Sequence, residues 1–578
     1  MTKKTVASPQ TKIEREQALD RDRRAVLGAL PEKALDLIAD HPYPVTLVQS
    51  MAEEDLYHLI HAIGLDDAVP VIALASNRQW EYLLDMETWA RDTVDTDAMS
   101  SWLSRLLKAD PDRFTHWITK DKRDDFVFYL YRNIQLHIRE YDQDPGEIPE
   151  DFFSEDQTYY LRLKPFAAEH QKQQEQRDLF LTDLLKRLSV FDFVTYRDLL
   201  LESSGLIPAE TQEELYRLRN VRLAEKGFLP FDEAVGIYQP LSVAEFAARE
   251  QKSRRYTGRQ VESYPWPVDP LQPGENANLF TRTLAQLNDP AMLQKLQAEF
   301  AGLCNRITAA DQRPIREKAA MHKVVHKAGD YISMGLEKIA AAIGDRAPYG
   351  NARLLQTHLL SDIFRVGYGC ALALKWKAGK WHRASWFNHE GLSIAFWGET
   401  WMGVLGGLLL KKPLFFLEDA TDQRYREFAT LSDIQRCETV LNDIIAFDDL
   451  FSLMNISTQP VKGYGFLTYQ NVLLTLWANH YLGETSGNSS PIPITGAQLQ
   501  QFHRELFQGE DPPHRISDSM RELFLGWLAD RSGLADYEIA ERMAPALERV
   551  FVEIENELGS VAVNDLDPRY VHLFLFNG

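Results

Sequence analysis

The segment from Trp376 to Trp401 holds the densest group of side chains that could do chemistry, with five tryptophans beside histidines and glutamates. Aromatic rings with a few convergent polar groups are typical of small-molecule pockets, and a histidine near a glutamate can act as a general acid or base. Neighbouring residues on a helix or strand point apart, and tryptophans also fill cores, so a hydrophobic core or a partner groove is the favoured interpretation. The candidate pocket residues are Trp386, His389, Glu390 and Glu399.

Two histidines have the spacing of a metal pair. His322 and His326 stand four residues apart, so they would share one face of a helix and could bind a divalent metal. Lys323, however, occupies the position where a zinc-dependent protease carries its catalytic glutamate. The three cysteines lie far apart along the chain and supply neither a disulfide framework nor a four-cysteine zinc site. We therefore predict neither a metal nor a cofactor.

The charge balance restricts the class of partner. The 578 residues carry a net charge of −21, which opposes binding to nucleic acid or to anionic lipid. The strongest membrane candidate is the apolar run 392–410, but Glu399 lies in its middle and favours a buried segment over a membrane span. Few cysteines and the lack of an apolar signal segment near the N-terminus indicate a soluble protein of the cytoplasm.

Residues 26–140 read as a succession of short amphipathic helices. Leu56, Leu59 and Ile60 begin an i, i+3, i+4, i+7 stripe that Gly64 ends. Asp110 followed by proline looks like an N-cap with Pro in the first turn. Helices of about three turns cannot bury their apolar stripes alone, so neighbours must stack. The pattern predicts a superhelical array of short helices.

The same spacing continues toward the C-terminus. Apolar residues at helical intervals predict further helices within 332–343, 467–482, 520–528 and 537–558. Gly403 and Gly407 stand four apart and indicate close packing of the backbone rather than a phosphate loop. We predict a mainly α protein, with an N-terminal superhelical array followed by a separate helical C-terminal region.

Two composition changes suggest domain boundaries. The acidic stretch 142–157 has the character of a solvated connector, and four prolines between 263 and 280 support neither helix nor central strand. The expected organisation is a polar leader at 1–25, a short-helix repeat domain at 26–150, a helical continuation or second domain at 151–262, a Pro-rich linker at 263–280 and a helical C-terminal domain at 281–578.

Two resemblances add to this interpretation. Residues 47–89 read LVQSMAEEDLYHLIHAIGLDDAVPVIALASNRQWEYLLDMETW and resemble the short-helix repeats of the cytosolic N-terminal domain of bacterial magnesium transporters. This resemblance implies a fold rather than transport, because the conducting membrane bundle is missing. Through EEDLYHLI, LLDMETW and RLAEKGFLPFDEAVGIYQP (222–240), the whole chain is similar to an uncharacterised family of bacterial cytoplasmic proteins, which implies no known activity.

Three functions remain open from the sequence. The leading hypothesis is a non-enzymatic interaction or regulatory protein that binds an unknown protein partner through a helical-repeat surface, since such arrays expose extended surfaces. The first alternative is an enzyme or small-ligand-binding protein with a pocket in residues 376–401. The second is a divalent-cation-responsive regulator built on acidic helix faces.

Overall fold

The computed structural model describes residues 12–165, 171–248, 278–312, 318–343, 350–464, 466–484, 490–508 and 513–577. Helices dominate these residues, and the few strands are short, so the predicted mainly α class is confirmed. The superhelical arrangement of the first helices stays a prediction. Most of the expected linker, residues 263–277, lies outside the described residues. The expected polar leader is described from residue 12 onward, and these residues belong to a helix.

Short helices fill the first part of the chain, as the apolar spacing predicts. Gly64 ends α4 with φ of +106°, and Asp110 caps α8 by accepting a hydrogen bond from the Arg113 N–H at 3.2 Å. The helices are α1 (Lys12–Leu27), α2 (Pro31–Ala39), α3 (Pro44–Gln49), α4 (Glu53–Ile63), α5 (Val69–Leu74), α6 (Asn77–Glu87), α7 (Thr96–Ala109), α8 (Pro111–Lys120), α9 (Arg123–Asn133), α10 (Gln171–Phe191), α11 (Phe193–Ser204) and α12 (Pro208–Glu225).

The helices that follow differ widely in length, from four residues in α13 to 26 in α17, and they include those predicted near the C-terminus. They are α13 (Phe231–Ala234), α14 (Val243–Ala248), α15 (Leu279–Leu284), α16 (Pro290–Asp311), α17 (Lys318–Ile343), α18 (Gly350–Thr357), α19 (Leu360–Ala384), α20 (Trp386–His389), α21 (Gly398–Leu409), α22 (Leu431–Leu453), α23 (Tyr469–Tyr481), α24 (Gly496–Leu506), α25 (Asp518–Ser532) and α26 (Asp536–Leu558). Short 3-10 turns are η1 (Pro145–Glu147), η3 (Val235–Tyr238), η5 (Ile394–Trp397), η6 (Gln459–Val461), η7 (Val563–Asp565) and η8 (Pro568–Tyr570).

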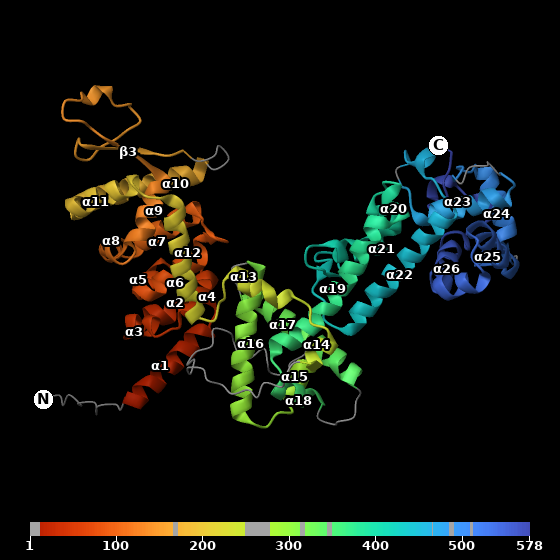
Figure 1. Cartoon of the computed structure of the whole chain (residues 1–578), viewed down its shortest axis with the longest axis horizontal. Coiled ribbons are helices and arrows are strands. Elements are labelled where there is room, and N and C mark those ends of the chain that lie inside the picture. The colour runs from red at the N-terminus through yellow and green to blue at the C-terminus, as the bar shows by residue number, and fades with distance from the viewer. Residues whose placement is uncertain are drawn as a thin grey trace.

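The strands form antiparallel pairs and no larger sheet within the described residues. The pairs are β1 (Trp89–Ala90) with β2 (Thr93–Val94), β3 (Ile134–Ile138) with β4 (Tyr159–Leu163), β5 (Phe415–Phe416) with β6 (Tyr425–Arg426), and β7 (Phe507–Gln508) with β8 (Arg515–Ile516). The acidic stretch expected to be a connector lies in the excursion between β3 and β4. We call residues 139–158 the acidic arm, and Figure 1 shows it projecting from the end of the molecule.

The buried apolar side chains divide into two clusters. One runs from Val26 to Leu223, and the other from Ala234 to Phe574. Phe228 packs against the first cluster and Leu229 against the second, so the chain passes from one core to the other between adjacent residues. We call residues 12–228 the N-terminal half and 229–577 the C-terminal half; Figure 1 shows the two halves in succession along the molecule. The predicted domain boundaries are a separate matter and stay predictions.

The C-terminal half contains a very close helix crossing between α17 and α19. A Cβ atom on Gly335 would lie 2.1 Å from the Ile363 backbone oxygen, and one on Gly367 would lie 2.0 Å from that of Tyr331. Only glycine permits this backbone contact. Gly407 is similarly confined, since its Cβ would lie 2.4 Å from the Leu414 oxygen, which agrees with the close packing predicted for this segment.

The apolar run 392–410 is divided between η5 and α21 and forms no continuous helix. Among the residues described, no helix combines the length and the apolar character needed to cross a membrane.

Candidate functional site

The predicted pocket residues lie on α20, just after it, and in the first turn of α21, and each has its own partner. Trp386 donates a hydrogen bond from Nε1 to the Ile456 backbone oxygen at 2.8 Å, and its ring packs against Phe451 with centroids 5.1 Å apart. Glu399 is exposed and forms an ion pair with Arg424 at 2.7 Å. Trp386 is therefore bound to the segment after α22, and Glu399 is bound to the segment just before β6.

The other two candidates also bond to the chain. His389 is exposed, and its Nδ1 lies 2.7 Å from the Ser385 backbone oxygen, which requires a proton on Nδ1. Glu390 accepts hydrogen bonds from Thr458 at 2.9 Å from the backbone N and 2.7 Å from Oγ1. The backbone N–H of Glu390 donates to the Trp386 oxygen at 2.9 Å, but the side-chain hydrogen bonds and ion pair of the four candidates lead to other residues rather than to one another. A ligand role for them stays a prediction.

A buried carboxylate outside the predicted set holds this segment in place. Asp448, only 3% exposed, accepts hydrogen bonds from the Phe387 N–H at 2.9 Å, the Trp386 N–H at 3.2 Å and Nε1 of Trp381 at 3.1 Å. Burial raises the pKa of Asp448 despite these three donors. The carboxylate fixes the start of α20 and the orientation of one tryptophan ring.

The aromatic rings around Asp448 pack as a core. We call Trp381, Trp386, Phe387, Trp397 and Trp401 the tryptophan cluster. Within it, the Trp397 ring lies 5.7 Å from that of Phe387, and the Trp401 ring stacks on Tyr469 at 4.7 Å. Trp397 is 1% exposed, and its Nε1 has no hydrogen-bond partner among the described residues. This cluster therefore has a packed interior with one unsatisfied indole N–H.

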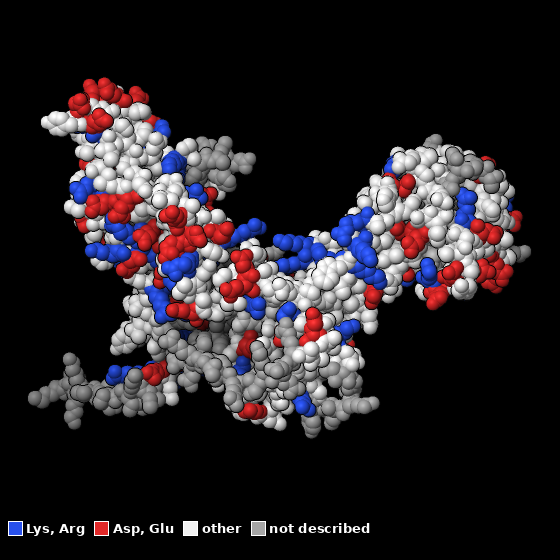
Figure 2. Space-filling model, viewed as in Figure 1, with Lys and Arg blue, Asp and Glu red and all other residues white. Residues whose placement is uncertain are grey.

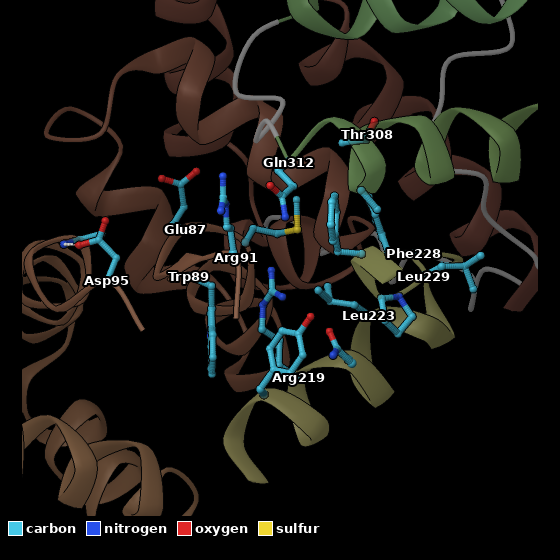
Figure 3. Close-up of a pocket in the computed structure, with 17 residues that line it drawn as sticks. Glu87, Trp89, Arg91, Asp95, Arg219, Leu223, Phe228, Leu229, Thr308 and Gln312 are labelled. Carbon is cyan, nitrogen blue, oxygen red and sulfur yellow. Dashed lines mark hydrogen bonds between the residues drawn. The ribbon is translucent and has the colours of Figure 1, made fainter. Parts of the chain in front are cut away.

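A different cavity lies where the two cores meet. Its volume is about 210 Å³, and we call it the junction pocket. The N-terminal half contributes the end of α6, the β1–β2 turn and α12, whereas residues 229–231 and the end of α16 come from the C-terminal half. Figure 3 shows these side chains gathered from both halves around one opening.

Arg219 on α12 lies in the wall of the junction pocket against two aromatic rings. Its Nε donates to the backbone oxygen of Asp85 at 2.7 Å, and its guanidinium lies 5.4 Å from the centre of the Trp89 ring. Tyr216, one helical turn earlier, packs on the same tryptophan at 5.7 Å. Burial lowers the pKa of Arg219, but a guanidinium remains charged at neutral pH.

Arg91 enters the pocket from the turn between β1 and β2. The turn follows from the pairing of Trp89 with Val94, and Arg91 adopts a left-handed conformation with φ of +63°. Such a conformation is costly for a residue with a Cβ atom. Figure 3 shows the Arg91 side chain on the same opening as Arg219.

The two carboxylates that line the pocket are engaged elsewhere. Glu87 accepts a hydrogen bond from the Tyr57 hydroxyl at 2.5 Å and lies 3.3 Å from Nε2 of His61. Asp95 caps α7 by accepting from the Ala98 N–H at 3.0 Å. Their lone pairs are thus partly used within the chain.

The two guanidinium groups that line the pocket, by contrast, have no carboxylate partner among the described residues. Across the described ranges, neither Arg91 nor Arg219 forms an ion pair with a carboxylate. A guanidinium presents planar N–H donors that match a carboxylate or a phosphate. The pocket therefore offers cationic donors beside aromatic rings, an arrangement suited to binding an anion. Sequence reasoning missed both arginines, because no local motif surrounds them.

The far wall of the pocket connects to a partly buried ionic network. Gln312 ends α16 with φ of +52°, and the preceding residue, Asp311, accepts from Tyr238 at 2.5 Å and from Lys327 at 3.1 Å, and also pairs with Lys412. Burial alone would raise the pKa of Asp311, but the two lysines and the tyrosine hydroxyl hold it below its ordinary value. These charges satisfy one another, so the network positions the end of α16.

His322 and His326, which have the spacing of a metal pair but for which we predict no metal, are both exposed on α17. Within the part of the chain that the structure describes, no three or more His, Cys, Asp or Glu side chains are grouped so that they could hold a metal ion.

Comparison with known proteins gives the chain a family. No curated protein and no solved structure matches it. The resemblance of residues 47–89 to the magnesium-transporter domain receives no support from these comparisons, whereas the predicted similarity of the whole chain to an uncharacterised family is confirmed. The model of a family of unknown function matches residues 11–577, and the chain therefore belongs to this family, DUF6178.

Proposed function

We propose that this protein is a non-enzymatic regulatory protein that binds a small anionic molecule in the junction pocket. The observation that carries the proposal is the pair of guanidinium groups, Arg91 and Arg219, which face one cavity without a carboxylate partner among the described residues. Arginine at such a position favours bidentate binding of a carboxylate or phosphate. Trp89 and Tyr216 supply aromatic surface for the rest of the ligand.

The size of the cavity limits the ligand. Pockets for drug-sized molecules span about 300–1,000 Å³. The junction pocket, at about 210 Å³, is smaller. It therefore suits a small carboxylate or phosphate ester better than a dinucleotide.

The position of the pocket suggests a regulatory role. Arg219 belongs to the N-terminal half and is tied to α6 through Asp85, which also receives a bidentate ion pair from Arg222. Thr308 and Gln312 belong to the C-terminal half. A ligand that contacts both sides stabilises one arrangement of the two halves, because binding shifts the population toward the state that binds best.

Thermal unfolding of the full chain tests this proposal. The probes are inorganic phosphate, glycerol phosphate and succinate, each compared with sodium chloride at matched ionic strength. At about one hundred times its Kd, a ligand that binds only the native state adds about 2.7 kcal/mol of stability. We expect a rise in Tm with at least one probe, and a Kd about 10–100-fold weaker after Arg219→Gln, since a charge-assisted hydrogen bond contributes about 1.5–3 kcal/mol.

Arg217→Gln is the matched control, because Arg217 lies on the same helix but is exposed and pairs with Glu214 at 2.6 Å. The control variant should bind the probe as the wild type does. Equal loss in the Arg217 and Arg219 variants, or no shift beyond that of sodium chloride with any probe, would contradict the proposal.

A specific observation also favours partner binding, the leading expectation from the sequence. Large apolar side chains are exposed where α10 meets α11, and contiguous patches of this kind mark interaction sites. Val190 is 83% exposed and Val194 is 57% exposed. We call Val190, Phe191, Phe193 and Val194 the apolar patch.

Affinity capture from the native cells tests partner binding with two variants. Val194→Asp should release a captured protein that the wild type retains, whereas Val221→Asp, at an exposed valine on α12, should retain it. Retention by both variants would contradict a role for the apolar patch.

The divalent-cation-responsive alternative rests on residues 47–89 and on acidic faces alone and stays a prediction.

A further inference from the structure

The acidic arm is an exposed, strongly negative projection. Residues 139–158 contain eight carboxylates and a single basic residue, Arg139. Asp142, Glu147 and Glu150 are exposed, and the nearby Tyr141 has a fully exposed ring, at 104%. Figure 2 shows Asp and Glu side chains gathered at the end of the molecule where Figure 1 shows the arm. The arm thus presents negative charge and an uncovered aromatic ring together.

One face of α19 has the opposite character. Trp376, Lys380 and Arg383 follow one another at i, i+4 and i+7, so they share one side of the helix. Trp376 is 55% exposed, and the two basic residues are also exposed. Lys377, next to the tryptophan, pairs with Glu438 at 3.6 Å and donates a hydrogen bond to Oδ1 of Asn442 at 2.5 Å. We call Trp376, Lys377, Lys380 and Arg383 the basic face.

Two of the three charges on the basic face, those of Lys380 and Arg383, are not neutralised by the described residues. In the segments that the structure describes, Lys380 and Arg383 have no carboxylate within ion-pair distance. Lys and Arg side chains gather over the middle of the molecule in Figure 2, in the region of α19 and α22 in Figure 1. A positive face on a chain of net charge −21 attracts a negative partner, and complementary charges fix its register.

We propose that the acidic arm of one copy of this protein binds the basic face of a second copy. The chain itself carries both complementary surfaces, each with an exposed aromatic ring, Tyr141 on the arm and Trp376 on the helix. The arm cannot reach the basic face of its own chain, since Figure 1 places the arm and α19 in different halves, far apart along the molecule. Such a head-to-tail contact generates closed rings or open chains of copies.

Sedimentation of the full chain at increasing concentration tests this proposal. At low salt the mass should rise with concentration, and at about 1 M salt, where the Debye length falls to about 3 Å, it should return to that of the monomer. The double variant Lys380→Glu with Arg383→Glu should weaken association at least tenfold. The double variant Asp142→Lys with Glu150→Lys should do the same. An equimolar mixture of the two variants should recover association, because the reversed charges complement each other.

Lys108→Glu with Lys120→Glu is the matched control, because both lysines are exposed on the N-terminal half, on α7 and α8. This control should associate as the wild type does, and circular dichroism should show the same helicity for all variants. A wild type that stays monomeric at low salt overturns the proposal. The proposal is also overturned if the basic-face variant loses association but the arm variant keeps it. In that case another surface or another molecule, and not the acidic arm, would bind the basic face.

Discussion

The junction pocket and the tryptophan cluster both combine aromatic rings with polar groups, but they differ in where the polar atoms point. In the tryptophan cluster, Asp448 accepts three N–H donors of the chain itself. In the junction pocket, Arg219 uses its Nε within the chain, and neither it nor Arg91 has a carboxylate partner in the described ranges. Both regions pack tryptophan, yet only the second leaves charged donors facing a cavity.

The difference teaches that composition alone is a poor guide to a binding site. The tryptophan cluster is dense in sequence because one local segment supplies most of its rings. The junction pocket is sparse in sequence because β1, α12 and α16 each supply a few side chains. Polar groups that satisfy one another stabilise a fold, whereas donors that remain available can recognise a ligand.

The largest expected effect tests whether the tryptophan cluster is a packed core. Trp397→Ala should lower the free energy of unfolding by about 3–5 kcal/mol, because it removes a buried indole and leaves a cavity. Trp397→Phe should cost less than Trp397→Ala, since it leaves a smaller cavity and the indole N–H has no partner to lose among the described residues. Chemical denaturation measures both values. If Trp397→Ala lowered the free energy of unfolding only slightly, the region would resemble an open pocket more than a core.

A smaller effect is expected from the carboxylate at the centre of that cluster. Asp448→Ala leaves the N–H groups of Trp381, Trp386 and Phe387 without their acceptor and should cost about 1–3 kcal/mol. The adjacent Asp449, which is exposed, is the control, and its change to alanine should stay within about 0.5 kcal/mol. Equal costs at the two positions would show that Asp448 does not organise the cluster.

Asp55, in the N-terminal half, is a half-buried carboxylate that, unlike Asp448, lacks donors of this kind in the part of the chain that the structure describes. Burial and then the neighbouring Glu54 raise its pKa to about 6, and it accepts no side-chain hydrogen bond from the described residues. Asp55→Asn should therefore stabilise the protein at neutral pH by about 1 kcal/mol.

The pH dependence of that gain has a definite sign. As pH falls from about 6 toward the ordinary value of 3.8, the native wild type binds a proton that the unfolded chain does not yet bind, so it gains stability and the advantage of Asp55→Asn shrinks. Denaturation of both proteins between pH 7 and pH 4 measures the difference. An advantage that grew on acidification would contradict the raised pKa.

The smallest stability change is expected at Arg91, and it sharpens the comparison most directly. Glycine adopts φ of +63° without strain, which offsets the greater freedom it gives the unfolded chain, so Arg91→Gly should change stability by no more than about 0.5 kcal/mol. The same variant should lose affinity for the anionic probe. A residue that adds binding but no stability belongs to a site, whereas a large destabilisation would make Arg91 part of the scaffold.

The local elements of the fold could be predicted from the sequence. The stripe of Leu56, Leu59 and Ile60 with Gly64 predicted α4, and Asp110 before proline predicted the start of α8. Tyr537–Leu558 corresponds to α26 within one residue at its start. These features depend on spacing along one helix and on cap residues beside it, so neighbouring residues determine them.

Apart from the helix caps, tertiary structure decided which of the polar side chains discussed above are satisfied. Asp448 lies among the buried residues Ile444 and Phe451 of α22, and its role follows only when Phe387 is brought to it from 61 positions away. Arg219 meets Asp85 across 134 positions, and the cavity beside them needs α16 of the other half as well. The physical reason is that burial and hydrogen-bond satisfaction depend on groups distant in sequence, whereas helix formation depends on neighbours.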